Sequence, residues 1–103
     1  MLNQLGKQIV EINKANGWNV ATPSDWHDPY KIPALLALVA TEVSEAVEGF
    51  RHNDRENFAE ECADIVIRVL DLTEGLGLDI EAAIVAKLGK NKQRGFKHGG
   101  KRI

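Results

Sequence analysis

Apolar residues recur three or four positions apart along most of this chain, and this helical period limits its fold more than any other feature. The first such stripe consists of Leu2, Leu5, Ile9 and Ile12. Asn16 and Gly17 are residues that commonly end a helix, so we expect the first helix to stop there. No segment reads as a strand. The sequence therefore predicts an all-α fold.

Boundary residues predict three further helices. Pro33 suits the first turn of a second helix, because its missing N–H would be unpaired there in any case. Asn53 and Asp54 offer a turn and an N-cap before a third helix. Gly77 then marks the end of the third helix, and Asp79 can cap a fourth.

The length of 103 residues supports one domain, spanning residues 1–103. We expect its Gly- and Lys-rich end, residues 95–103, to be a mobile tail unless a ligand orders it. The third predicted helix has a wide apolar face, which is hard for one small chain to cover. We therefore expect a four-helix bundle that is completed by oligomerisation.

Several classes of protein are excluded early. The longest apolar run, Ala34 to Ala40, is far shorter than the roughly 20 residues that span a bilayer. The first residues lack the apolar core of a signal peptide. The single cysteine, Cys62, rules out an internal disulfide framework and a cysteine zinc cluster. We expect a cytoplasmic protein with no membrane partner.

Charge is unevenly distributed along the chain. The formal net charge is −2, which argues against a globally basic nucleic-acid binder, and we expect no nucleic-acid partner. Residues 42–81, however, hold twelve acidic residues and three Arg, whereas residues 82–103 hold seven Lys or Arg and no acid. An acidic middle and a basic end suggest a function that involves cations and anions together.

The acidic middle contains two carboxylate pairs with helical spacing. Glu42 and Glu45 lie three residues apart beside an apolar stripe, and Glu61 and Asp64 repeat this arrangement. An antiparallel hairpin would bring the two pairs opposite each other. Their repulsion would require a cation, and oxygen ligands favour Mg²⁺ or, as a substitute, Mn²⁺. The alternative is a solvated acidic face, which we prefer for one pair but not for two.

A di-iron site is disfavoured, because such bundles use Glu-x-x-His pairs. The histidines of this chain are not at that spacing; they are His27, His52 and His98.

The predicted fourth helix carries the complementary charge. Lys87, Asn91 and Arg94 continue the apolar line of Ile80 and Ile84, so we expect this line to face inward. Lys and Arg can hold phosphate oxygens, and the amide can contact a sugar or base. Lys90 lies one residue off the line and can assist. The alternative is that these cations only complement the helix dipole.

Residues 16–32 form an irregular connection that is long for so small a domain. Its two tryptophans, Trp18 and Trp26, either stack on a nucleobase or plug the end of the bundle; both interpretations stay open. His27 either contacts a base or phosphate or is simply solvated. Near the C-terminus, the run from His98 to Lys101 can wrap a phosphate through its amides, or it is only a floppy end.

Taken together, these motifs resemble the MazG-type all-α nucleoside triphosphate pyrophosphohydrolases. The resemblance rests on TEVSEAVEGFR, on FAEECADIVIRVLDL and on the closing segment KNKQRGFKHGGK, and it covers about two-thirds of the chain, from Leu35 to Lys101. One departure is visible: Thr41 stands where the family often has the first of two adjacent acids.

The resemblance implies hydrolysis of an NTP or dNTP between the α and β phosphates, with Mg²⁺, by a homodimer or a dimer-of-dimers tetramer. The metal ligands would be Glu42, Glu45, Glu61 and Asp64. We expect Glu45 to accept the proton of the attacking water, while Lys87 and Arg94 stabilise phosphate charge.

Two alternatives to this function remain. One is a non-catalytic dimerisation or regulatory module whose basic tail binds a partner. The other is a related phosphohydrolase that acts on a phosphoribosyl nucleotide. The sequence leaves the base preference, the sugar preference and the cellular role open.

Overall fold

A computed structural model describes residues 1–94 of the chain, and these residues contain helices and no strand. The elements are α1 (Leu2–Ala15), the short 3-10 helix η1 (Pro23–His27), α2 (Lys31–Arg51), α3 (Arg55–Gly75) and α4 (Ile80–Arg94). The predicted all-α fold is confirmed. The expectations for the tail and for the run from His98 to Lys101 lie outside the described residues.

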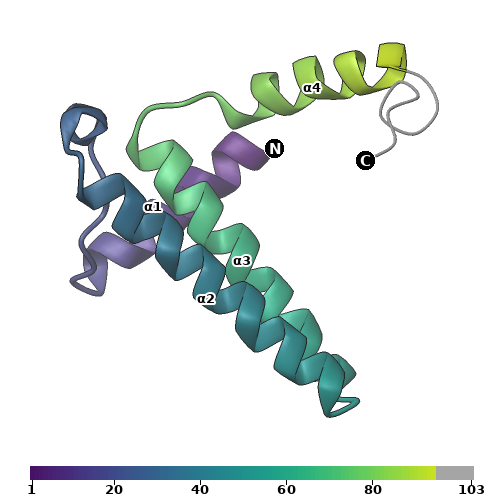
Figure 1. The fold of residues 1–103 in the computed structure, drawn as a ribbon. Coiled ribbons are helices and arrows are strands. Elements are labelled where there is room, and N and C mark those ends of the chain that lie inside the picture. Colours follow the sequence, from purple (N-terminus) through teal and green to yellow (C-terminus); the bar gives the residue numbers. More distant parts are fainter. Residues whose placement is uncertain (95–103) are drawn as a thin grey trace.

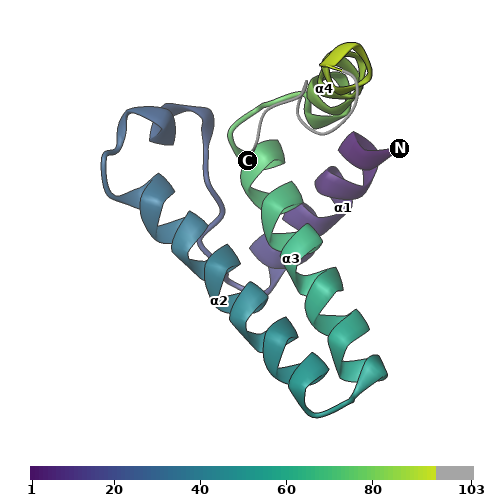
Figure 2. The ribbon, with the colours of Figure 1, turned by 45° about the vertical axis from the view of Figure 1, so that its right-hand side comes forward.

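Helices α2 and α3 form a long antiparallel hairpin (Figure 1). Helix α1 crosses this hairpin and packs against α3. The hairpin turn is built as predicted: Asn53 adopts a left-handed backbone with φ of 54°, and the Asp54 carboxylate accepts a hydrogen bond from Asn57 N at 3.0 Å. From this turn the two helices diverge toward their other ends (Figure 2).

The connection from α1 to α2 is held by its acidic side chains. Asp25 accepts a hydrogen bond from Thr22 N at 2.8 Å and pairs with Lys31 Nζ at 2.7 Å. Asp28 accepts from the backbone N–H groups of Tyr30 and Lys31, at 2.8 and 3.0 Å. These bonds satisfy amides at the start of α2, so the segment has a definite shape although only η1 within it is helical.

Helix α4 leaves the end of α3 and extends away from the hairpin (Figure 1). Gly77 takes the left-handed conformation there, with φ of 79°, and Asp79 caps α4 by accepting from Ala82 N at 3.0 Å. Asn3 Nδ2 donates to Asp79 at 2.8 Å, and the terminal amine pairs with Glu81. These polar contacts tie the start of α4 to α1 and leave the rest of α4 exposed.

The buried core is small. It centres on Ala21, Leu72 and Leu76, with Ile32 and Leu35 packed against them. The radius of gyration is 16.0 Å, above the roughly 13 Å typical of a compact domain of about 100 residues. Large apolar side chains are consequently exposed on all four α-helices; they include Leu5 and Ile12 on α1, Leu36, Val43, Val47 and Phe50 on α2, Val66 on α3, and Val85 and Leu88 on α4.

None of the described helices combines the length and the apolar character that a membrane crossing would require.

Candidate metal centre and substrate cleft

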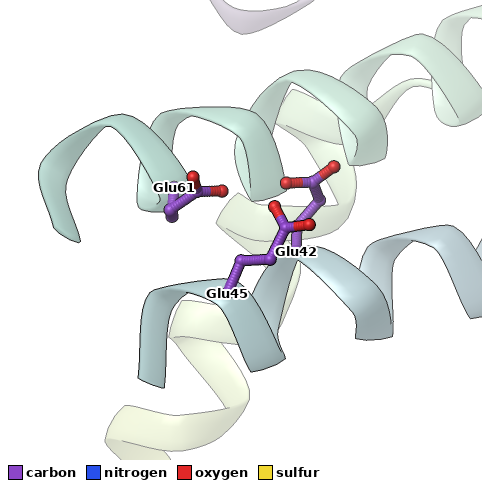
Figure 3. Close-up of side chains that lie close together, drawn as sticks. All are labelled: Glu42, Glu45 and Glu61. Carbon is purple, nitrogen blue, oxygen red and sulfur yellow. The ribbon is translucent and has the colours of Figure 1, made fainter. Parts of the chain in front are cut away.

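Three carboxylates meet between the two helices of the hairpin. Glu42 and Glu45 project from α2 toward Glu61 on α3 (Figure 3). Each offers one carboxylate oxygen, and these three oxygens lie within 4.8 Å of one another. Glu42 is buried, Glu61 is partly buried and Glu45 is exposed, so the cluster is open to solvent on the Glu45 side. The hairpin thus brings both members of the first predicted pair, Glu42 and Glu45, close to one member of the second pair, Glu61.

The carboxyl groups of the cluster have pKa values that are shifted in opposite directions. Desolvation, reinforced by the neighbouring carboxylates of Glu45 and Glu42, raises the pKa of Glu61 to about 7. The pKa of Glu42 is lowered instead, chiefly because Arg68 donates a hydrogen bond to it. The two acids that face each other across the hairpin therefore hold their protons over different pH ranges.

Arg68 is a site residue that the sequence analysis missed. Its Nε donates to Glu42 Oε1 at 2.8 Å across the hairpin. The signal was available, because Arg68 follows Asp64 by four residues and Glu61 by seven, which places all three along one side of α3. Arg68 supplies a positive charge at the acidic cluster from within the same chain.

The residues present fit a divalent cation. Glu42 Oε2 and Glu61 Oε2 are buried, and no residue in the range 1–94 provides either oxygen with a hydrogen bond. Buried carboxylate oxygens without a partner carry a desolvation cost, which a bound cation would offset. All of the donors are carboxylate oxygens, the ligand type that Mg²⁺ and Mn²⁺ prefer.

The fourth predicted ligand, Asp64, stands apart from this cluster. Asp64 is exposed on α3. Within residues 1–94, it does not belong to the group of carboxylates whose oxygens lie within 4.8 Å of one another. Its charge nevertheless contributes to the raised pKa of Glu61. The Thr41 hydroxyl, at the departure from the resembled motif, turns to its own helix and donates to the Ala37 carbonyl at 3.1 Å.

An open cleft of about 410 Å³ runs from the acidic cluster toward α1. Glu42, Asp64 and Arg68 line it near the cluster, and Leu35 and Leu38 of α2 face Ile67 and Leu72 of α3 across it. Its other end is lined by Asn13, Trp18, Asn19 and Asp71. A volume of this order suits a small organic ligand.

The two tryptophans of the α1–α2 connection have different positions. Each is 66% exposed, so neither plugs the end of the bundle in a single chain. Trp18 lines the cleft, whereas Trp26 and His27 belong to η1 and are exposed outside the cleft that the described residues form. Of the predicted base-contacting residues, the chain thus places Trp18 at the cleft.

The basic line of α4 does not reach the acidic cluster within one chain. Its polar members, Lys87, Asn91 and Arg94, are exposed, as is Lys90 beside the line. The expectation that this line faces inward is wrong for the single chain, because α4 is attached to α1 and α3 near its start and then extends away from them (Figure 1).

The fold and the site define an α-helical hairpin protein with a carboxylate cluster, of a kind that could hold a metal ion, beside a ligand-sized cleft. The family model for the MazG nucleotide pyrophosphohydrolase domain matches residues 31–97, about two-thirds of the chain, and the chain belongs to this family. The matched range includes the acidic cluster, Arg68 and the basic line of α4. Searches of curated proteins and of solved structures gave no match.

Proposed function

We propose that this chain is a Mg²⁺-dependent nucleoside triphosphate pyrophosphohydrolase, which cleaves an NTP or dNTP between the α and β phosphates to a monophosphate and pyrophosphate. The observation that carries the proposal is the cluster of Glu42, Glu45 and Glu61, of which Glu42 also lines the open cleft. Such an enzyme would serve nucleotide-pool housekeeping in the cytoplasm.

The acidic cluster would hold the metal. Glu42, Glu45 and Glu61 are the proposed ligands. Asp64, whose charge already acts on Glu61, is the proposed fourth ligand and would have to move toward the other three. Bound Mg²⁺ would supply positive charge against the phosphate oxygens and favour ionisation of the attacking water. Among these carboxylates Glu45 is exposed beside the cluster, and we propose it as the group that accepts the proton of that water.

The cleft would hold the nucleoside. Its apolar walls, Leu38 on α2 and Ile67 on α3, suit a flat heterocycle, and the exposed indole of Trp18 offers a surface on which a base can stack. Arg68 stands between this region and the carboxylates, where its guanidinium can turn from Glu42 to a phosphate. Trp26 and His27, on the neighbouring η1, would contact the substrate only after this connection moves.

A second copy of the chain would complete the site. Arg94, Lys87 and Asn91 are proposed to contact phosphates and sugar, with Lys90 assisting, yet α4 extends away from its own cluster. The exposed apolar side chains of α2, α3 and α4 provide a surface for self-association. We therefore propose a homodimer or a dimer-of-dimers tetramer, in which α4 of one subunit serves the carboxylates of the other.

The proposal is tested by incubating the purified chain with a panel of NTPs and dNTPs and Mg²⁺, with pyrophosphate as the measured product. We expect turnover by the wild type and loss of at least about 100-fold in Glu61→Ala. Glu60→Ala is the matched control, because Glu60 is the exposed neighbour on the same helix. Absence of turnover across the panel would contradict the proposal and favour a non-catalytic module. Turnover of a phosphoribosyl nucleotide alone would favour the related phosphohydrolase that acts on such a substrate.

A further inference from the structure

The end of the cleft away from the carboxylates contains a fixed polar pair. Asn13 Nδ2 on α1 donates to Asp71 Oδ1 on α3 at 2.9 Å, in a partly buried position. Both residues line the cleft together with Trp18. Asp71 follows Asp64 by seven residues, which corresponds to about 10 Å along the helix axis. The pair is therefore separated from the carboxylate end of the cleft, where the phosphates are proposed to bind, by a distance that leaves room for a sugar.

This pair has hydrogen-bonding capacity to spare. An ionised carboxylate accepts through both of its oxygens, and the bond from Asn13 uses one position on Oδ1. No ion pair engages Asp71 within residues 1–94; the ion pairs formed there involve other acids. Because Asn13 holds the carboxylate to the cleft wall, Asp71 presents a hydrogen-bond acceptor of fixed position.

The proposed substrate has a part that matches this arrangement. A nucleobase has a flat face that stacks on an indole and an edge that carries donors and acceptors. With the base beside Trp18, its edge would meet the Asn13–Asp71 pair. An exocyclic amino group donates to a carboxylate, whereas a carbonyl at the same position would place oxygen against oxygen.

We propose that the Asn13–Asp71 pair is the base-reading element of this chain, and that it selects nucleotides whose base carries an exocyclic amino group. This inference rests on the proposed function and specifies its substrate class: cytosine is favoured over uracil, and adenine over hypoxanthine. Asp71 is the residue that determines this preference. Asn13 positions its carboxylate.

The test compares kcat/KM within two substrate pairs, dCTP with dUTP and dATP with dITP, for the full chain in Mg²⁺. In the pair that the wild type hydrolyses faster, we expect the substrate with the exocyclic amino group to have the higher kcat/KM by at least about tenfold. Asp71→Asn, which keeps the shape but adds a donor that a carbonyl can accept, should reduce that ratio by at least about tenfold. Because the ratio compares two substrates of one preparation, partial loss of folded protein does not change it.

Glu74→Gln is the matched control. Glu74 lies one turn beyond Asp71 on α3 and lines a separate groove beside Lys7 and Thr22. Its substitution by Gln removes one carboxylate charge, as Asp71→Asn does. We expect its substrate ratios to equal those of the wild type. A second measurement uses the monophosphates dCMP and dUMP, whose binding is followed by tryptophan fluorescence; here too the wild type should prefer the amino-bearing base and Asp71→Asn should not.

The outcomes separate the two proposals. Turnover with no preference for amino-bearing bases, or with ratios that Asp71→Asn leaves unchanged, would overturn the base-reading role and leave the proposed function intact. A purely structural Asn13–Asp71 link between α1 and α3 predicts this second result, together with a lower melting temperature. A chain that neither hydrolyses nor binds any of these nucleotides would overturn both proposals.

Discussion

Arg68 on α3 reaches across the hairpin to Glu42 on α2, where its Nε lies 2.8 Å from Oε1. The Glu42 side chain is 10% exposed and that of Arg68 is 38% exposed, so a surface guanidinium compensates a buried carboxylate. The acidic cluster consequently carries its own counter-charge. Cations that bind this cluster meet Arg68 as a competitor for Glu42.

The first prediction concerns this ion pair. Arg68→Met leaves Glu42 buried without its partner and strengthens repulsion within the cluster. A fully buried pair that loses one member costs about 3–5 kcal/mol, and the exposure of Arg68 reduces this to an expected loss of about 1–2 kcal/mol of unfolding free energy in EDTA. Added Mg²⁺ should stabilise Arg68→Met more than it stabilises the wild type, because the cation takes over the role of the guanidinium. Denaturant melts with EDTA and with Mg²⁺ measure both effects.

Arg51→Met provides the control for that experiment. Arg51 pairs with Glu48 at 3.0 Å on the surface of α2, with both side chains more than half exposed. Its loss should cost less than about 0.5 kcal/mol and should not alter the response to Mg²⁺. Equal stabilities of the two variants in EDTA would mean that the Arg68–Glu42 pair contributes nothing beyond a surface ion pair.

The second prediction concerns pH. The pKa of Glu61 rises from an ordinary value of 4.5 to about 7 in the folded chain, so the folded state binds more protons than the unfolded state between these values. The contribution of Glu61 to stability is therefore greatest below its unfolded pKa and falls as the pH rises toward its folded pKa. In EDTA, the melting temperature of the wild type should fall more than that of Glu61→Gln between about pH 5 and about pH 8.

Glu60→Gln, with the exposed neighbour changed, should follow the wild-type pH curve. Parallel curves for the wild type and Glu61→Gln would show that Glu61 has no raised pKa. The same linkage predicts that Mg²⁺ binds more tightly as the pH rises through this range, because the cation must displace the proton of Glu61.

Much of the fold follows from local signals in the sequence. Asn16 and Gly17, Asn53 and Asp54, and Asp79 mark helix boundaries through backbone conformation and capping, which depend on a few adjacent residues. The direction of α4 depends on tertiary contacts such as that between Asn3 and Asp79, which no periodicity encodes.

The site divides along the same line. Helical spacing was sufficient to predict that Glu42 and Glu45 would face Glu61, because a short turn between two long helices leaves few other pairings. The Asn13–Asp71 bond was not foreseen, since it joins residues 58 positions apart through the crossing of α1 over α3. Exposure of Trp18 likewise depends on the course of residues 16–30 rather than on any motif.

The third prediction tests how closely the α1–α2 connection packs on α3. A Cβ atom at Gly75 would lie 2.5 Å from the carbonyl oxygen of Ala21, so Gly75→Ala must displace backbone that forms part of the core. We expect a loss of about 1–3 kcal/mol of unfolding free energy. Gly89→Ala is the opposite case, since nothing lies within 4 Å of its Cβ position in α4, and there we expect a gain of about 0.5–1 kcal/mol from helix propensity. Equal effects of the two changes in thermal and denaturant melts would contradict this packing.

The fourth prediction concerns the proposed sharing of the site between subunits. Glu61→Ala removes a carboxylate of the acidic cluster, and the double variant Lys87→Ala/Arg94→Ala removes the phosphate contacts proposed for α4. Each homodimer should be nearly inactive. If α4 of one subunit serves the cluster of the other, a mixed dimer contains one site in which both halves are wild type.

Co-refolding equal amounts of the two inactive variants should therefore restore activity. Random pairing makes about half of the dimers mixed, and one of the two sites in each mixed dimer is intact, so we expect about a quarter of the wild-type activity. Refolding each variant alone is the control and should restore none. If α4 instead folds back onto its own cluster, every subunit carries a defective site, and the mixture should be as inactive as its components; that result would exclude sharing between subunits and assign the α4 contacts to a rearrangement within one chain.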